Sequence, residues 1–555
     1  MWTAFAFALG ALQAPELSAE APVERPKLVV IFVVDQMIPE HLDRLRTLWT
    51  GGFKRFVEQG RRFSEAQYDY AGTETCPGHT TLGTGRMPWK HGIVANDWLA
   101  REENADIYCV ADAEVEPVRQ FARPFADGRS PRAIRGPGLA DYLEAADPKS
   151  QTVTISTKDR AAIGLGGQHP DLALWWDLAG SGFMTSTWFA RELPSFVRAW
   201  NDGWLERARA SDLGESWAST LPESLDGTST AADDRAGEAN FLDKRHTFPY
   251  DAPDLSTPPE DKQRAQWASF VYHSPLSDRW VLELAGRAVE RLALGSDEHV
   301  DYLGVSCSAC DIVGHATGPY SREVTDLLLR DDRELGKFFA LLDERVGAGR
   351  WLAVLSADHG VLELPEALVA RGVDSGRVSS KELAAAVKST RAAVKARFGD
   401  DFFVDSDAGG LRFSAERMRA AGVAPKDVRA EAKAAFAAAA PWCERAFTSD
   451  ELAELDPAKP WPDDLRLQRH SFESERSADV LFQPRRGWLV SVGVGTSHGT
   501  PHPYDRRVPL VFLGGRVAAG IDPRSASPAD VVPTLLGELG LALPAELDGR
   551  PLPLR

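Results

Sequence analysis

The sequence predicts an α/β protein built on a doubly wound, mostly parallel sheet with helices on both faces. Continuous apolar runs rich in β-branched residues are typical of strands that are buried on both faces of a parallel sheet. Amphipathic segments lie between these apolar runs. Four of the apolar runs are followed by a polar residue. Ligands of such sheets collect beyond the carboxyl ends of the strands, so we expect those four polar side chains at one edge.

The expected strands share a mainly apolar composition and a short length. They are KLVVIFVV (27–34, followed by Asp35), TVTIST (152–157, followed by Lys158), HVDYLGVS (299–306, upstream of Asp311), WLAVLSA (351–357, followed by Asp358) and RVPLVFLGG (507–515). The last of these runs is expected to be a strand of the same kind.

Amphipathic helices are expected at about 136–146, 321–346 and 527–540. Two regions depart from the alternating pattern. The region at about 170–275 is rich in Trp, Pro, Asp and Ser, and the region at about 362–490 contains Ala-rich helices near 380–397 and 414–440. We interpret both as insertions that cap the sheet edge of a single catalytic domain spanning 22–555. Most of the tryptophans in the first region are expected in the core.

The charge balance limits the partners of the protein. The 555-residue chain has 63 Lys and Arg against 81 Asp and Glu, a formal net charge of −18. Such a surface repels a polyanion, so we expect no nucleic-acid binding, and an anionic substrate requires a local positive site. The sequence leaves the oligomeric state open, and a monomer is compatible with it.

Residues 1–21 resemble a signal peptide, with a short apolar run at 2–12 followed by small residues, although no Lys or Arg precedes that run. We therefore predict a periplasmic or secreted protein. The run is too short to span a membrane, and no later stretch approaches that length.

The five cysteines are too few for a dense disulfide framework. Cys307 and Cys310 form a CxxC pair, which we interpret as a local disulfide or as buried thiols, because a structural zinc requires four ligands. Cys109 and Cys443 can pair only if the fold brings them together.

Six Asp and His residues lie at strand ends or in the loops beyond them. They are Asp35, Asp311, His315, Asp358, His359 and His498, in the contexts VVDQM, CDIVGHATG, SADHG and GTSHGTPH. A mixture of carboxylate and imidazole suits a divalent ion such as zinc. Six ligands are too many for one tetrahedral ion and suit two. Each residue taken alone is compatible with a cap or an ordinary loop contact, so the prediction rests on their combination.

The motifs TCPGH, HGIVANDW, STKDR, CDIVGHATGP, SADHG and TSHGTPHPYDRRVPLVF, spread from about residue 27 to the C-terminus, resemble the alkaline phosphatase superfamily. The resemblance is closest to its phosphate-irrepressible alkaline phosphatases. It implies an alkaline phosphatase-like fold and two zinc ions. One zinc would be held by Asp311, His315 and His498, and the other by Asp35, Asp358, His359 and the oxygen of Thr75.

The resemblance also makes Thr75 the nucleophile. Thr75 precedes Cys76-Pro77-Gly78, where a helix is expected to begin, and a neighbouring metal ion would activate its hydroxyl. Cys76 is a stronger nucleophile, but a zinc-bound thiolate would trap the metal, so Cys76 is the less favoured attacker. His79 is expected to bond to nearby backbone rather than to a metal.

The resemblance assigns Asn96, Lys158 and Arg160 to the phosphoryl oxygens of the substrate. Alternatives are a turn at Asn96 and a solvated pair of cations beside Asp159. The implied reaction is ping-pong hydrolysis of small phosphate monoesters through a phosphothreonine intermediate, with release of inorganic phosphate.

Three other functions fit parts of the sequence less well. Nucleotide pyrophosphatase/phosphodiesterases are similar in the threonine, the asparagine and all six ligands, but a diester has one fewer free oxygen to pair with Lys158 and Arg160. Sulfatases require an oxidisable cysteine where Thr75 stands and an acid where Gln36 stands. A binding protein without activity would be expected to have lost its nucleophile or ligands, and none is missing.

Overall fold

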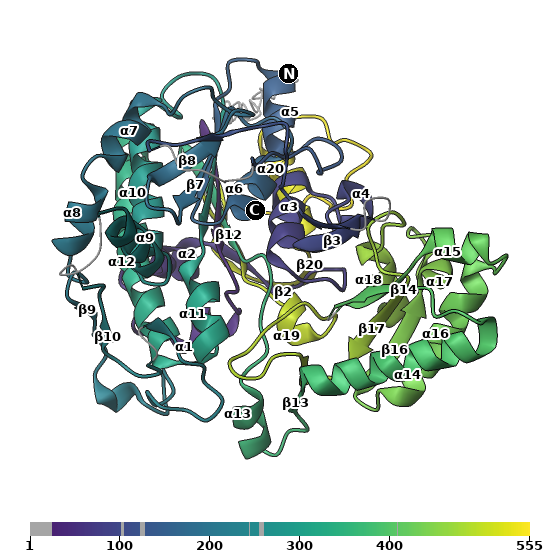
Figure 1. Cartoon of the computed structure of the whole chain (residues 1–555). Helices are drawn as coiled ribbons and strands as arrows, with labels where there is room; N and C mark the ends of the chain where they lie inside the picture. The colour runs from purple at the N-terminus through teal and green to yellow at the C-terminus, as the bar shows by residue number, and fades with distance from the viewer. Residues whose placement is uncertain (1–24, 101–104, 122–127, 243–244, 255–259, 408) are drawn as a thin grey trace, which may run out of the picture.

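The computed structural model describes residues 25–100, 105–121, 128–242, 245–254, 260–407 and 409–555. The signal peptide predicted at 1–21 lies outside these residues. A ten-stranded sheet forms the centre of the molecule, with helices on both sides (Figure 1). In spatial order its strands are β20 (Gly520–Ala526), β2 (Arg61–Ala66), β19 (Leu510–Gly514), β12 (Trp351–Ser356), β1 (Leu28–Val34), β11 (Asp301–Cys307), β6 (Thr152–Ser156), β7 (Leu172–Asp177), β8 (Gly182–Ser186) and β5 (Pro117–Val118).

Strand β1 lies in the middle of the sheet and pairs in parallel with β11 and β12, with Leu28 opposite both Asp301 and Trp351. All seven of its residues are buried, as the apolar run at 27–34 predicted. Its side chains alternate between two cores, because Val30 packs in one cluster and Ile31 in the other. Burial on both faces is the signature of a doubly wound sheet, and the predicted fold class is confirmed.

The two cores are closed by different helices. One contains residues of α2 (Gly52–Gln59), α10 (Leu276–Arg291) and α12 (Arg322–Leu342). The other contains residues of α3 (Thr75–Thr84), α5 (Leu139–Ala146), α6 (Asp159–Gly166) and α20 (Val531–Glu538). The helices expected at about 136–146, 321–346 and 527–540 correspond to α5, α12 and α20, the last preceded by the short helix η4 (Pro528–Asp530).

The run at 507–515 forms strand β19, but it does not share the direction of its neighbour. β19 is antiparallel to both β12 and β2. The chain reaches β19 through the loop that carries His498 and through α19 (Pro503–Arg506), at the edge where the parallel strands end. A strand that starts from that edge must run back across the sheet.

The region at about 170–275 is only partly an insertion, which corrects the sequence-based interpretation. Its first strands, β7 and β8, belong to the central sheet, and all six residues of β7 are buried. The remainder includes α7 (Ser195–Asn201), α8 (Trp204–Arg209), β9 (Ser216–Trp217), β10 (Tyr250–Asp251) and α9 (Glu260–Tyr272). Trp175, Trp176 and Trp200 are buried, as expected for core residues, and Trp188 is half-buried.

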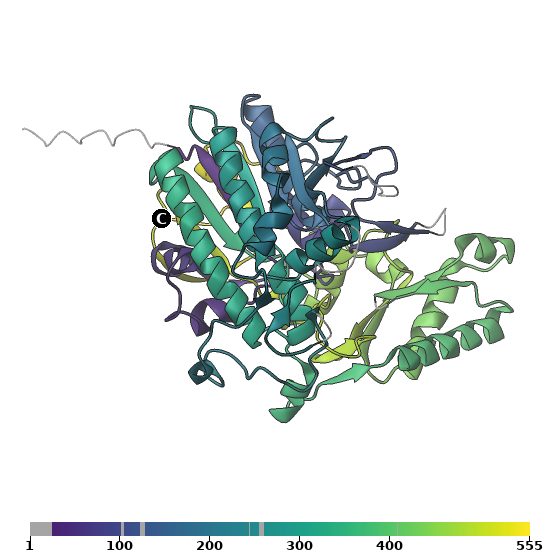
Figure 2. The same ribbon diagram turned by 60° about the vertical axis from the view of Figure 1, so that its left-hand side comes forward.

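A smaller unit lies at the side of the large sheet (Figure 2). A four-stranded sheet, in the order β14 (Phe403–Ser406), β15 (Gly410–Phe413), β17 (Val480–Pro484) and β16 (Cys443–Thr448), packs with α14 (Ser380–Phe398) and α16 (Pro425–Ala439) around a separate core. The helix expected at 414–440 is two helices, because Gly422 has a φ of 68° between α15 (Ala415–Ala420) and α16. β13 (Gly376–Val378) and β18 (Trp488–Val490) pair where the chain enters and leaves this unit.

Within the ranges given above, none of the helices combines the length and the apolar character that a membrane crossing requires.

Candidate metal centre

Three adjacent parallel strands deliver the three predicted aspartates to one edge of the sheet. Asp35 directly follows β1, Asp358 lies two residues beyond the end of β12, and Asp311 lies in the first turn of α11 (Ala309–Thr317), which follows β11. The carboxyl ends of parallel strands meet at one edge, so three separate sequence motifs converge there. His315 lies one turn after Asp311 on α11, and His498 comes from the loop between β18 and α19.

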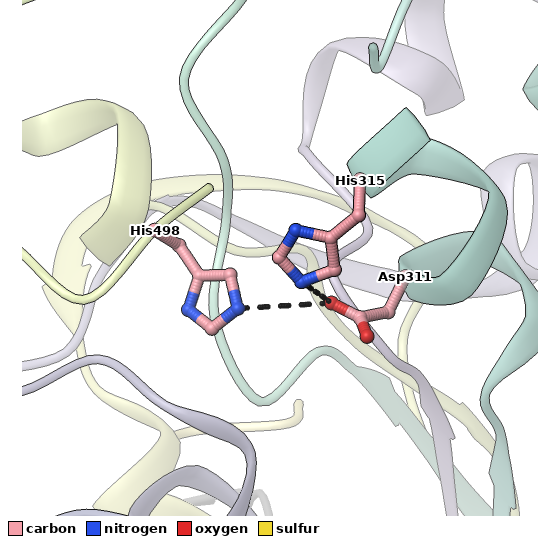
Figure 3. A group of neighbouring side chains, drawn as sticks. All are labelled: Asp311, His315 and His498. Atoms are coloured by element: carbon pink, nitrogen blue, oxygen red, sulfur yellow. Dashed lines mark ion pairs between the residues drawn. The ribbon is translucent and has the colours of Figure 1, made fainter. Parts of the chain in front are cut away.

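One group consists of Asp311, His315 and His498, whose side chains point toward one another (Figure 3). Asp311 Oδ1 lies 3.1 Å from His315 Nε2 and 3.7 Å from His498 Nε2. His315 Nδ1 donates to the Thr496 carbonyl at 2.8 Å, and His498 Nδ1 donates to the Thr73 carbonyl at 2.7 Å. These bonds fix the tautomer of each ring and leave both Nε2 lone pairs free to ligate a metal ion.

The second group consists of Asp35, Asp358 and His359, all fully buried. His359 Nδ1 donates to the Gly360 carbonyl at 3.0 Å, so its Nε2 is again the atom that is free to ligate. Among the described residues, Asp35 Oδ1, Asp358 Oδ2 and His359 Nε2 are all buried and have no hydrogen-bond partner. Buried polar atoms are costly when left unpaired, and a divalent cation is the partner that suits all three.

The two groups adjoin each other. The rings of His359 and His498 stack with centroids 3.5 Å apart and planes inclined by 15°. Lys158 Nζ donates to Asp35 Oδ2 at 2.7 Å and to Asp311 Oδ2 at 2.6 Å, and thus joins one carboxylate of each group. A single cationic side chain placed between two potential ion sites is well placed to meet an anion that bridges them.

Burial and neighbouring charges separate the pKa values of these groups. Burial, with the rings of His359 and His315 beside it, holds the pKa of His498 well below its usual range, so this imidazole is neutral and able to ligate. Burial and the Asp358 carboxylate raise the pKa of Asp35. Burial also opposes ionisation of Asp311, but the Lys158 ammonium and His315 outweigh it and lower its pKa.

The segment around Thr75 packs directly on the second group. Thr75 is the first residue of α3 and is 1% exposed, and its hydroxyl makes no hydrogen bond to the described part of the chain. A Cβ on Gly78 would meet the Asp358 carbonyl oxygen at 2.2 Å, so only glycine permits this approach. His79 Nδ1 donates to the Thr75 carbonyl at 2.8 Å and lies 3.3 Å from Asp358 Oδ2. His79 thus bonds to backbone, as the sequence suggested.

Two further residues that were predicted to bind the substrate, Asn96 and Arg160, lie near the first turn of α3. Asn96 Oδ1 accepts from the Cys76 amide at 2.9 Å, and within the described residues its Nδ2 makes no hydrogen bond. Arg160, the second residue of α6, donates through Nη1 to the Tyr108 hydroxyl at 3.3 Å. Its Nε is buried and has no partner in the part of the chain described above. Both residues therefore retain donors for an anion.

The structure changes the account of the cysteines. Cys76 and Cys109 form a disulfide, so Cys76 cannot be the attacking thiolate and Cys109 does not pair with Cys443. Cys307 and Cys310 are free, buried thiols, which was one of the two interpretations of the CxxC pair. Burial and the nearby Asp278 and Asp331 carboxylates raise the pKa of both thiols, so they are poor nucleophiles.

Gln36 is a site residue that was not predicted from the sequence, where it appeared only as a departure from the sulfatase pattern. Its side chain donates to Asp311 Oδ1 at 2.7 Å, and its backbone amide donates to Asp358 Oδ1 at 3.0 Å. Gln36 has a φ of 68°, a left-handed conformation that directs both donors toward the two groups. Its position directly after Asp35 was the only signal available in the sequence.

The chain is similar to proteins of a known family. A family model described as type I phosphodiesterase / nucleotide pyrophosphatase matches residues 29–505. Alkaline phosphatase PafA from Elizabethkingia meningoseptica is 31% identical over 536 residues, which cover 96% of this chain and 94% of that protein. A crystal structure of wild-type PafA matches with a TM-score of 0.86 at 30% identity, over 96% of this chain and 99% of that chain.

A second structure of PafA, with a TM-score of 0.85 at 30% identity and the same coverage, is a mutant in which a threonine, an asparagine, a lysine and an arginine are substituted. These four positions are separated by the same intervals as Thr75, Asn96, Lys158 and Arg160. The family match and the near full-length relative confirm the resemblance seen in the sequence motifs. The chain therefore belongs to the type I phosphodiesterase / nucleotide pyrophosphatase family of the alkaline phosphatase superfamily, and it is an enzyme of that superfamily.

Proposed function

We propose that this enzyme hydrolyses small phosphate monoesters with two zinc ions and with Thr75 as nucleophile, and that it releases inorganic phosphate. The observation that carries the proposal is the pair of adjoining Asp and His groups beside the first residue of α3. Asp311, His315 and His498 would hold one ion, and Asp35, Asp358, His359 and the Thr75 oxygen would hold the other. When bound, two such ions would supply Lewis acidity for the attacking and leaving oxygens.

The remaining steps are carried out by side chains of the protein. The Thr75 hydroxyl loses its proton to solvent and its oxygen bonds to phosphorus, while the bond from phosphorus to the leaving oxygen breaks and the alkoxide takes up a proton from water. Water then hydrolyses the resulting phosphothreonine, which restores the hydroxyl and releases inorganic phosphate. Asn96 Nδ2, Lys158 and Arg160 bind the phosphoryl oxygens that do not react. Asp358 and His359 are buried with Thr75, which keeps the attacking group away from bulk water.

The preference for monoesters rests on two cationic side chains. Lys158 and Arg160 lie two residues apart at the end of β6, and the pKa of Lys158 is raised because Asp311 and Asp35 outweigh the effect of burial. A monoester dianion offers one more charged oxygen to such a pair than a diester does. The relatedness to PafA, which carries the name alkaline phosphatase, supports the same choice.

A phosphodiesterase activity is the second candidate, because the matching family model is described as type I phosphodiesterase / nucleotide pyrophosphatase. Turnover of an aryl phosphate and of the matching bis-aryl diester by the zinc-loaded enzyme decides between the two. We expect kcat/KM to be at least about 100-fold higher for the monoester, since one lost charge-assisted contact costs about 3 kcal/mol. A higher kcat/KM for the diester would replace the proposal with the alternative.

We also propose a periplasmic or secreted location. The disulfide between Cys76 and Cys109 supports it, because such bonds form and persist in oxidising compartments. The signal-like composition of residues 1–21 points the same way.

A further inference from the structure

The disulfide joins two segments that carry different parts of the proposed phosphate site. Cys76 follows Thr75 at the start of α3, and Cys109 follows the hairpin formed by β3 (Asp97–Ala100) and β4 (Ala105–Tyr108). Both sulfur-bearing side chains are fully buried. The covalent bond therefore links the nucleophile helix to the base of a hairpin of antiparallel strands.

Asn96 lies at that base and is bonded from both sides of the disulfide. Its side-chain oxygen accepts from the Cys76 amide at 2.9 Å, and its carbonyl accepts from the Cys109 amide at 2.8 Å. Its own amide donates to Glu74 Oε2 at 2.7 Å. The position of Asn96 relative to Thr75 is thus set by the residues that flank the nucleophile and by the disulfide partner.

Arg160 is bonded to the other strand of the same hairpin, also at its base, where Tyr108 pairs with Asp97. Tyr108, the neighbour of Cys109, donates its hydroxyl hydrogen to Asp159 Oδ1 and accepts from Arg160 Nη1 at 3.3 Å. Arg129 Nε donates to Asp159 Oδ2 at 2.7 Å. Because the single proton of the phenol is used toward Asp159, its lone pair faces the guanidinium and orients it.

We propose that the Cys76–Cys109 disulfide and Tyr108 are positioning residues, which hold Asn96 and Arg160 in register with the Thr75 oxygen. The inference rests on the proposed function, since it assigns a task to residues that would bind the phosphoryl group. We assign none of the three positioning residues a contact with substrate. They act through the hairpin, whose base carries one phosphoryl donor and whose last residue orients the other.

Catalytic positioning of this kind has a measurable cost when it is lost, because misplacement of a reacting group by about 1 Å can lower a rate about 100-fold. The double variant C76A/C109A removes the bond without leaving a thiol beside Thr75. We expect it to lower kcat/KM for an aryl monophosphate by about 10-fold or more in an otherwise unchanged enzyme. C443A, which removes a free cysteine of the small unit, is the matched control and should leave kcat/KM unchanged.

The decisive measurement is a double-mutant cycle. In an N96A/R160A background the residues to be positioned are gone, so C76A/C109A should cost less than about 2-fold there. A disulfide that merely stabilises the fold would lower Tm and would change kcat/KM equally in both backgrounds. Equal losses, or a folded and metal-loaded C76A/C109A enzyme with unchanged kcat/KM, would overturn the inference.

Y108F keeps the disulfide and tests whether Tyr108 orients Arg160. If C76A/C109A does not fold, Y108F still tests the inference. We expect Y108F to lower kcat/KM in the parent enzyme and to have no such effect in an R160A background. Persistence of the same loss without Arg160 would contradict the assignment of Tyr108.

The covalent bond itself is checked by counting thiols in denatured, unreduced protein, where three of the five cysteines should react and all five after reduction. Five reactive thiols before reduction would contradict the disulfide. Failure of the proposed function is separate, since it would be seen in the parent enzyme as absent monoester turnover. Failure of this inference would be seen in the variants and in the thiol count, while the parent enzyme still turned over monoesters.

Discussion

Three histidines show how single side chains are prepared for a metal ion. His315, His359 and His498 each donate Nδ1–H to a backbone carbonyl, at 2.8, 3.0 and 2.7 Å. A carbonyl can only accept, so each ring is held in the tautomer whose Nε2 carries the free lone pair that a metal ion would require. The orientation of each ring is set by a backbone carbonyl rather than by another side chain.

Thr75 offers a direct test at this scale. Thr75→Ala removes the proposed attacking oxygen and leaves Asn96, Lys158 and Arg160 in place. We expect kcat for an aryl phosphate to fall by about 1,000-fold or more, because the nucleophile acts as one unit with the groups that activate it. Inhibition of the residual activity, or calorimetry, should still detect binding of inorganic phosphate. Turnover near that of the parent enzyme would show that another group attacks.

The residues of the candidate centre were predictable because each lies at the end of an apolar run or within a short motif. Asp35 and Asp358 are examples, since a buried strand ending in a carboxylate is readable from the chain alone. The role of Gln36 could not be predicted from the sequence, because it depends on a φ of 68°, which the residue type does not indicate. The Cys76–Cys109 bond depends on where the hairpin folds back, which the spacing of the cysteines does not determine.

At the scale of elements, α11 carries two proposed ligands and is anchored by its neighbours. Asp278 of α10 accepts from the Ser308 and Ala309 amides at the start of α11, at 2.9 and 3.1 Å. Asp331 of α12 lies beside it. Burial raises the pKa of Asp278 to about 6, and burial together with Asp278 raises the pKa of Asp331. Two helices thus hold a third through a carboxyl pair that resists full ionisation.

This pair predicts a pH dependence of stability. A carboxyl whose pKa is raised on folding stabilises the protein fully below its unfolded pKa, and that contribution is lost as the pH rises through about 6. D278N cannot ionise and retains an oxygen for the two amides. We expect the fall in Tm between pH 5 and pH 7 to be smaller in D278N than in the parent enzyme.

E298Q is the matched control for D278N, because it removes a carboxylate that is 91% exposed. Its Tm should follow the pH dependence of the parent enzyme. An identical pH dependence of Tm in D278N and in the parent enzyme would refute the role of the pair.

Elements were predictable where one face or both faces are apolar, as in β1 and α12. The direction of a strand was not predictable. β19 has the composition of a parallel strand, but it runs antiparallel to β12. Composition also concealed β7, whose LALWWD lies in a stretch rich in Trp, Pro, Asp and Ser. Strand direction depends on the side of the sheet from which the chain arrives, and that is a property of the connection.

At the scale of the whole molecule, the candidate centre collects residues from nearly the full length of the chain. Asp35, Asp311 and Asp358 bring three carboxylates to one buried edge, and the ammonium of Lys158 contacts only two of them directly. Without further positive charge such a concentration of carboxylates is unfavourable. A pair of divalent cations would therefore contribute to stability as well as to chemistry.

Metal removal tests both contributions together. Treatment with a zinc chelator should abolish turnover and lower Tm, because an ion that binds only the folded chain at about 1,000 times its Kd contributes about 4 kcal/mol. Addition of zinc should restore both quantities. A rate and a Tm that are untouched by chelation, in protein without stoichiometric transition metal, would disprove the dinuclear centre.

The position of His498 in the chain has a consequence for maturation. This imidazole follows the small unit built around α14 and α16, so it is synthesised long after the other five candidate ligands. An unfinished polypeptide that stops before this loop offers one group of only two side chains. The group of Asp311, His315 and His498, with the ion proposed for it, can therefore form only after the small unit has been synthesised, whereas Asp35, Asp358 and His359 all precede that unit.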